Sequence, residues 1–226
     1  MFTVFAAQLN KKISAIETKC WAKSLVFALG LAFAVSSQAS IKISPVRPVI
    51  ESNTKSTSLT LQNGSDSDKV FDVRVMAWKN QDAQGNDQLE PTVNVVSSLP
   101  VVKIPANESF IIRLVVRQRS TMPQDTYRLI LKDITPAKRD GTKTEVAVSL
   151  QQIMLPLFVM NDTTSSGKLS LQNGVVSNVG GRTVRLTEWK DKSGKVQSGL
   201  RYLLPGKSMN LNIVSLESVK FNDEMY

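Results

Sequence analysis

The chain has 226 residues, a formal net charge of +9, one cysteine and no histidine. Without histidine it cannot build an imidazole-dependent serine triad or the zinc and copper sites that use imidazole ligands. A pair of carboxylates, as in glycosidases, would be the remaining way to make an enzyme site, but the acidic residues fall at expected turn and surface positions. We therefore expect a binding protein with no enzymatic activity, no metal and no cofactor.

Residues 1–39 have the pattern of a secretory signal peptide. Four lysines precede the uncharged apolar run 25–35, and small residues stand at Ser37 and Ala39. This run is too short for a membrane-spanning helix, which needs roughly 20 apolar residues. We expect cleavage after Ala39, although the translation start stays open because the lysine-containing segment is long for a signal.

Export would leave a chain that relies on packing alone. Its only cysteine, Cys20, lies in the signal, so residues 40–226 cannot form a disulfide in an oxidising compartment. Loss of four lysines and Glu17 lowers the formal charge from +9 to +6. The basic residues are scattered and aromatics are few, so we expect no nucleic-acid binding. An acidic or carboxylate-bearing partner fits this charge better.

From residue 41 onward the chain alternates short apolar runs with Gly, Asn, Asp and Pro, and it has no sustained helical period. This pattern predicts an all-β fold of the sandwich type. A polar, turn-forming stretch at 160–168 predicts a linker, so we expect two sandwich domains, 40–160 and 161–226, the second one small. The expected strands are 58–63, 69–78, 109–119, 126–134, 146–159, 168–173, 182–189 and 208–213.

Within several runs, alternate residues are apolar, which predicts which side chains face the core. The expected inward residues are Phe71, Val73, Val75, Ala77, Phe110, Ile112, Leu114, Val116, Tyr127, Leu129 and Leu131. The expected outward residues include Trp78, Arg128, Ile130 and Lys132. We expect Trp78 and Trp189 to be packing or rim residues.

The stretch 146–159, "VAVSLQQIMLPLFV", changes character at two glutamines. Before them, Val146, Val148 and Leu150 alternate with Ala, Ser and Gln; after them almost every residue is apolar. A second short pattern, "LQNG", occurs at 61–64 and again at 171–174. Asn-Gly is a common hairpin turn, so both an internal duplication and chance remain open as explanations.

The order of these motifs resembles the periplasmic chaperones of the chaperone–usher pilus pathway. The residues that carry the resemblance are "ISPVRPVI" (43–50), "SLTLQNGSDSDKVFDVRVMAW" (58–78), the Ile104–Arg117 segment, "YRLILKDI" (127–134), "LPLFV" (155–159), "SLQNG" (170–174) and "YLLPGKS" (202–208). The resemblance implies two immunoglobulin-like domains and periplasmic location. It also implies fimbrial subunits as clients and an outer-membrane usher as a partner.

In this family the last strand of the first domain is lent to a subunit that lacks a strand of its own. By resemblance, Val146, Val148 and Leu150 would insert into the groove of the subunit, in donor-strand complementation. The alternative is that these three side chains complete the core of their own domain. Three aliphatic side chains at roughly 1.5–3 kcal/mol each would be enough to hold a subunit.

The family also holds the C-terminal carboxylate of the subunit with an arginine and a lysine. Arg47 fits the arginine, because a guanidinium can bind a carboxylate with two hydrogen bonds. Pro156 stands where the lysine is expected, so the second anchor is uncertain, with Arg128 and Lys132 as candidates. This departure, with the prolines near residue 45, is more similar to the divergent, archaic branch of the family.

The leading hypothesis is a periplasmic chaperone that stabilises fimbrial subunits by donor-strand complementation and delivers them to an usher. The alternative is a secreted pilin or adhesin-type subunit. Such a subunit would need a free alternating arm at its mature N-terminus, and residues 40–57 alternate only weakly and contain two prolines. An orphan chaperone with a different client, and self-association of the free protein, both stay open.

Overall fold

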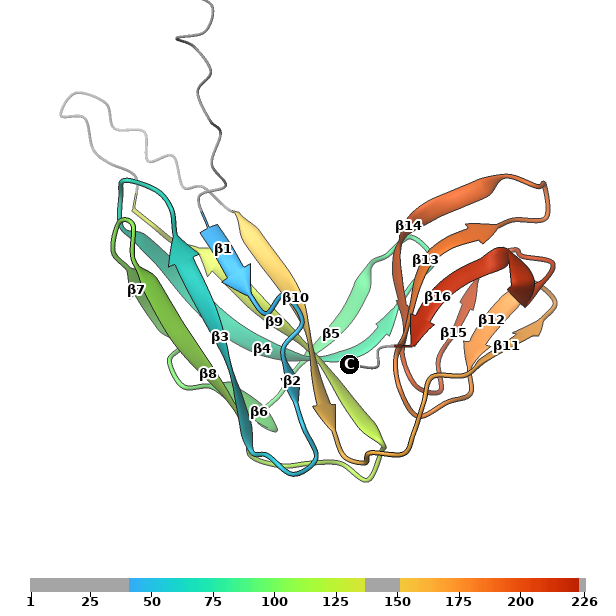
Figure 1. Ribbon diagram of the computed structural model, residues 1–226, viewed down its shortest axis with the longest axis horizontal. Coiled ribbons are helices and arrows are strands. Elements are labelled where there is room, and N and C mark those ends of the chain that lie inside the picture. Colours follow the sequence, from blue (N-terminus) through green and yellow to red (C-terminus); the bar gives the residue numbers. More distant parts are fainter. Residues whose placement is uncertain (1–40, 137–150, 224–226) are drawn as a thin grey trace, which may run out of the picture. The chain divides into compact units, whose positions relative to one another are not determined.

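The computed structural model of the protein describes residues 41–136 and 151–223. Apart from one short 3₁₀ turn, Leu216–Ser218, the regular elements in these ranges are strands, so the all-β prediction is confirmed (Figure 1). No helix among the described residues is long and apolar enough to cross a membrane.

Among the described residues, ten strands build the first sandwich. They are β1 Ile41–Ser44, β2 Val49–Ile50, β3 Ser56–Asn63, β4 Lys69–Gln81, β5 Asp87–Pro91, β6 Val95–Ser97, β7 Val101–Ile104, β8 Ser109–Val116, β9 Gln124–Asp133 and β10 Gln152–Met160. One sheet has the order β1-β3-β8-β6, and the other has the order β2-β10-β9-β4-β5, with β7 beside β4. The chain passes from the first sheet to the second between β1 and β2.

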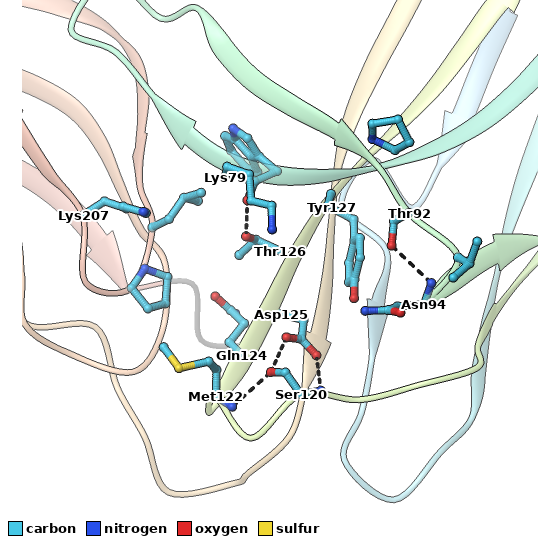
Figure 2. Close-up of a pocket in the computed structure, with 16 residues that line it drawn as sticks. Lys79, Thr92, Asn94, Ser120, Met122, Gln124, Asp125, Thr126, Tyr127 and Lys207 are labelled. Carbon is cyan, nitrogen blue, oxygen red and sulfur yellow. Dashed lines mark hydrogen bonds between the residues drawn. The ribbon is translucent and has the colours of Figure 1, made fainter.

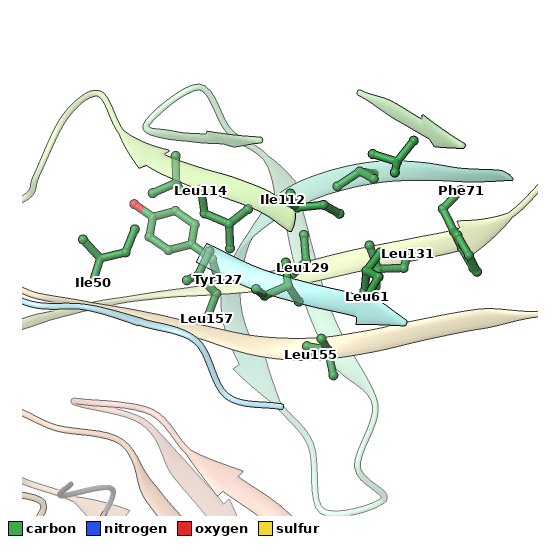
Figure 3. Close-up of a cluster of buried hydrophobic side chains, with 14 of the residues drawn as sticks. Ile50, Leu61, Phe71, Ile112, Leu114, Tyr127, Leu129, Leu131, Leu155 and Leu157 are labelled. Carbon is green, nitrogen blue, oxygen red and sulfur yellow. The ribbon is translucent and has the colours of Figure 1, made fainter. Parts of the chain in front are cut away.

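Alternate side chains of the two sheets meet in one apolar core. Figure 3 shows Leu61 and Ile112, from β3 and β8, meeting Leu129 and Leu131 of β9. The predicted inward residues Phe71, Val73, Ile112, Leu114, Tyr127, Leu129 and Leu131 are all buried, and Val75, Ala77, Phe110 and Val116 pack against them partly exposed. The two-residue period of the sequence therefore identified this core correctly.

The second sandwich is smaller. Its strands are β11 Leu169–Gln172, β12 Val175–Asn178, β13 Val184–Lys190, β14 Val196–Leu203, β15 Ser208–Asn210 and β16 Val219–Asp223. They form two sheets, β11-β12-β15 and β14-β13-β16. Between them lies a separate core that contains Val176, Leu186, Trp189 and Met209. The boundary between the two domains at residue 160 stays a prediction.

The hairpin of β4 and β5 is longer than the sequence suggested. Strand β4 continues to Gln81, three residues beyond the predicted end, and β5 returns from Asp87. The turn is held by Asp82, whose carboxylate accepts hydrogen bonds from the backbone N–H of Gln84 and Asn86. Its tip residue Ala83 packs against the core of the second sandwich.

The two "LQNG" tetrapeptides have different structures. Asn173 and Gly174 both have positive φ angles, +52° and +82°, and make the tight turn between β11 and β12. Asn63 instead ends β3 with its side chain buried, where its amide donates to the carbonyls of Ser67, Ile104 and Pro105. The repeated letters therefore do not mark repeated structure.

The buried core predicts a large mutational effect at Leu129. Leu129→Ala removes a fully buried side chain, and we expect the free energy of unfolding to fall by about 2–5 kcal/mol. Ile111→Ala is the control, since its side chain is 64% exposed and should change stability by less than about 0.5 kcal/mol. Urea unfolding of residues 40–226 measures both. Equal losses for the two variants would contradict the placement of this core.

The carboxylate of Asp133 predicts an acid-sensitive step. Burial acts to raise its pKa, but hydrogen bonds from Thr135 and an ion pair with Lys69, 3.3 Å away, together hold the pKa below the ordinary value. Stability from this group is therefore present above the unfolded-state pKa near 4 and is lost as the pH falls through the lower folded-state pKa.

We expect Asp133→Asn to lower stability at pH 7 by about 1–3 kcal/mol and to flatten the loss of stability below pH 4. Unfolding measured by urea between pH 7 and pH 2.5 tests this. Asp66→Asn, at an exposed position, is the control. If Asp133→Asn loses stability below pH 4 as steeply as the wild type does, the Lys69–Asp133 pair does not drive acid unfolding.

Candidate functional site

One side of strand β10 is paired along its whole length. It forms an antiparallel ladder with β9 from Gln152 to Met160. On its other side, β2 pairs with it in parallel only at Phe158 and Val159. Within residues 41–136 and 151–223, no strand pairs with that side from Gln152 to Leu157. We call this segment the open edge.

Hydrogen bonds at its two ends show which residues face the open edge. The N–H of Asp133 on β9 donates to the carbonyl of Gln151, whereas the N–H of Phe158 donates to Pro48 on the β2 side. Backbone groups alternate in direction along a strand. The residues that face outward are therefore Gln152, Met154 and Pro156. Met154 also has a side chain that is 46% exposed.

The position of Pro156 explains why a proline is tolerated in this sheet. It pairs with Arg128 of β9, but its own nitrogen faces the open edge, where no ladder bond to β9 is lost. The resemblance to the chaperone family had predicted a lysine at this position. The structure places it where the absence of an N–H costs the sheet nothing.

Arg47 lies in the crossing between β1 and β2, next to the far end of the open edge. Its neighbour Pro48 accepts the hydrogen bond from Phe158. Val49 is registered with Phe158 in the parallel pair, so Arg47 and Pro156 each precede that pair by two residues. The side chain of Arg47 is half-buried and has an interaction partner.

Arg128 binds a carboxylate of the protein itself. Its Nε and Nη2 donate to the two oxygens of Asp87 at 2.7 and 3.1 Å, and the two side chains are only 7% and 5% exposed. The guanidinium carbon lies 3.5 Å from the ring centre of Trp78. The Nε/Nη2 edge of the guanidinium is thus engaged within the chain, and little of the side chain is exposed to a foreign carboxylate.

The other candidate, Lys132, is half-buried on β9. It pairs with Gln152, the first residue of the open edge, and with Asp72 of β4. It lies four positions from Arg128 along the strand, roughly 13 Å away. Lys132 and Arg47 therefore lie near opposite ends of the open edge. The remaining predicted site residues, Val146, Val148 and Leu150, lie outside the described residues.

Sequence reasoning missed the residues that support Arg128. The amide of Gln81 donates to Asp87 at 2.8 Å, and its oxygen accepts the backbone N–H of Tyr202 on β14 at 2.7 Å. The rings of Trp78 and Tyr202 meet edge to face, 5.2 Å between centres. One relay thus runs from β9 through the β4–β5 hairpin to the second sandwich. The only sequence signal was Trp78, an aromatic on the expected outward face.

A pocket of about 520 Å³ lies near the ends of β4 and β9, and Figure 2 shows its lining. Asp125 accepts hydrogen bonds from the side chain and the backbone of Ser120. Burial, aided by the nearby charge of Asp125, raises the pKa of Tyr127 to about 12, so this phenol stays neutral. Lys79 pairs with Glu90 at 3.3 Å. These groups are satisfied internally, so the open edge is the stronger candidate.

The Arg128–Asp87 pair predicts a non-additive mutational effect. Arg128→Met leaves a buried carboxylate without its cation, and we expect a loss of about 3–5 kcal/mol. The double variant Arg128→Met/Asp87→Leu removes both charges and should lose less than the single variant. A urea-unfolding double-mutant cycle measures the coupling. Additive losses would show that the pair is not energetically coupled.

Comparison with known proteins places this architecture in a family. A family model described as "Pili and flagellar-assembly chaperone, PapD N-terminal domain" matches residues 40–164. The probable fimbrial chaperone EcpB of Escherichia coli O1:K1 is 22% identical over 195 residues, 82% of this chain and 87% of that protein.

Two solved structures share the fold. The chaperone–adhesin pre-assembly complex CsuC–CsuE of the archaic Csu pili of Acinetobacter baumannii matches with a TM-score of 0.58 and 21% identity, over 82% of this chain and 94% of the other. The Salmonella enterica complex of SafA pilin with the SafB chaperone matches with a TM-score of 0.59 and 17% identity, over 79% and 86%. The predicted pair of immunoglobulin-like domains is confirmed, and the chain belongs to the pili and flagellar-assembly chaperones.

Proposed function

We propose that the protein is a periplasmic chaperone that holds fimbrial subunits by donor-strand complementation and passes them to an outer-membrane usher. The observation that carries the proposal is the open edge of β10. A strand with unpaired N–H and C=O groups on one side can add a strand of another protein. The open edge follows directly after Val146, Val148 and Leu150 in the sequence.

The described part of β10 supports different roles for the two halves of the 146–159 stretch, one in the core of its own domain and one in subunit binding. Ile153, Leu155 and Leu157 belong to the core of the first sandwich, so this half of the stretch is committed to its own domain. The alternating apolar residues before the glutamines, Val146, Val148 and Leu150, would then be the ones that enter the subunit groove. Their apolar surface, at roughly 1.5–3 kcal/mol for each side chain, would supply the affinity.

The cations around the open edge support a carboxylate anchor, and they favour Arg47 or Lys132 over Arg128. The side chain of Arg128 is only 7% exposed and already holds the carboxylate of Asp87 with two hydrogen bonds. If Arg47 holds the C-terminal carboxylate, the last strand of the subunit runs parallel to β10, because its C-terminus then lies at the Pro156 end. If Lys132 holds it, the strand runs antiparallel.

The pilin alternative fits the fold less well. A subunit that donates its N-terminal arm needs that arm unpaired, whereas Ile41–Ser44 form β1 and pair with β3 of the same chain. The following residues, Val49 and Ile50, pair with β10. The segment that would have to be donated is therefore part of the sandwich.

Co-purification with a fimbrial subunit encoded in the same gene cluster tests the proposal. We expect the subunit to be soluble only with the chaperone, and Val148→Glu to weaken the complex more than tenfold, since a charge would enter an apolar groove. Ile111→Glu, on an exposed position of β8, is the matched control. Equal solubility of the subunit without the chaperone, or with Val148→Glu, would sink the proposal.

Single alanine variants locate the carboxylate anchor. Loss of a charge-assisted hydrogen bond should weaken binding by about 10- to 100-fold for whichever of Arg47→Ala or Lys132→Ala removes the anchor. Lys42→Ala, at an exposed position on β1, serves as the control. Titration against the subunit, with and without an added C-terminal residue, measures the effect. Unchanged affinity in both variants would remove both residues from the site.

A further inference from the structure

Only the first part of the open edge offers backbone N–H groups to a partner strand. Gln152 and Met154 present outward N–H groups, but Pro156 has none. The next outward N–H belongs to Phe158 and is already bound by the carbonyl of Pro48. A strand that pairs with β10 therefore meets two N–H donors, at Gln152 and Met154. It then meets a gap, the position of Pro156 where the donor is missing, and after that β2.

The gap is a barrier to sliding along the edge. A one-residue slip of a strand turns its apolar side chains to the wrong face, so a bound strand can change register only in steps of two. A step of two toward β2 would place a carbonyl opposite the ring of Pro156, where it receives no hydrogen bond. Beyond that point β2 occupies the edge, since Val49 and Ile50 pair with Phe158 and Val159.

We propose that Pro156 is a positioning residue that ends the pairing of the bound subunit strand and so fixes its register on β10. This inference rests on the proposed function, because it takes the partner to be a subunit strand that pairs with the open edge. Pro156 and the β2 pairing act together: the proline removes a donor and β2 closes the remaining edge. The register in turn decides which groove sites receive Val146, Val148 and Leu150.

Disulfide mapping reads the register directly. Residues 40–226 contain no cysteine, so Gln152→Cys introduces a single thiol on the open edge. Subunit variants with one cysteine at each successive position of the facing strand are co-expressed with it and oxidised. A disulfide forms only when the two Cα atoms lie about 4.4–6.8 Å apart, so the reactive position reports the pairing.

With Pro156 in place we expect one dominant reactive position in the subunit. Pro156→Val restores the missing N–H in a residue suited to strands, and a second reactive position should appear two residues away, carrying at least about a fifth of the product. Pro91→Val, at another strand proline of the same sheet, should keep the single position. Thermal unfolding of each variant verifies that it folds.

Moving the proline to another outward-facing position of β10 provides a second, independent test of its effect on the register. Met154→Pro combined with Pro156→Val moves the gap by two residues, and the dominant position should move by two in the same direction. The same single position in wild type, Pro156→Val and the double variant would overturn the inference while leaving the chaperone function intact. No complex between the wild-type chain and the subunit would instead reject the proposed function.

Discussion

A buried ion pair, between Arg128 of β9 and Asp87 of β5, organises the outer face of the larger sheet. Neither charge could remain there alone, because an unpaired charge with so little access to water is strongly unfavourable. The pair fixes the start of β5 against β9, and Trp78 covers the guanidinium. Gln81 extends the network to the backbone of Tyr202, so a single set of contacts joins β9, the β4–β5 hairpin and β14.

This constraint also distinguishes Arg128 from the other two candidate cations, Arg47 and Lys132. Arg128 lies on the same outward face as Lys132, and by residue type it is the better carboxylate ligand. Its side chain is only 7% exposed and is paired with Asp87 of the same chain. Arg47 and Lys132 lie near the two ends of the open edge, so in the proposed complex the choice of anchor would also set the direction of the bound strand.

The core was predictable and the site was not, for different physical reasons. Tyr127, Leu129 and Leu131 were assigned to the core because strand geometry sends alternate side chains to the same face, a local property that needs no knowledge of partners. Asp87 could not be assigned to Arg128, because the two lie 41 residues apart and their contact depends on how the β4–β5 hairpin returns. Val146, Val148 and Leu150 lie outside the described residues, so their role stays a prediction.

The sequence by itself determined that the fold is all-β. Its two-residue apolar period predicted the sandwich, and the absence of histidine excluded sites that depend on an imidazole. The tertiary structure decided which conformation identical or ambiguous short sequence motifs adopt. The same four letters make a hairpin turn at Asn173 and a buried tether at Asn63, and Pro156 is harmless because its nitrogen faces an edge. Whether a backbone group faces a neighbour or an open side depends on strand pairing between distant residues, which no local pattern encodes.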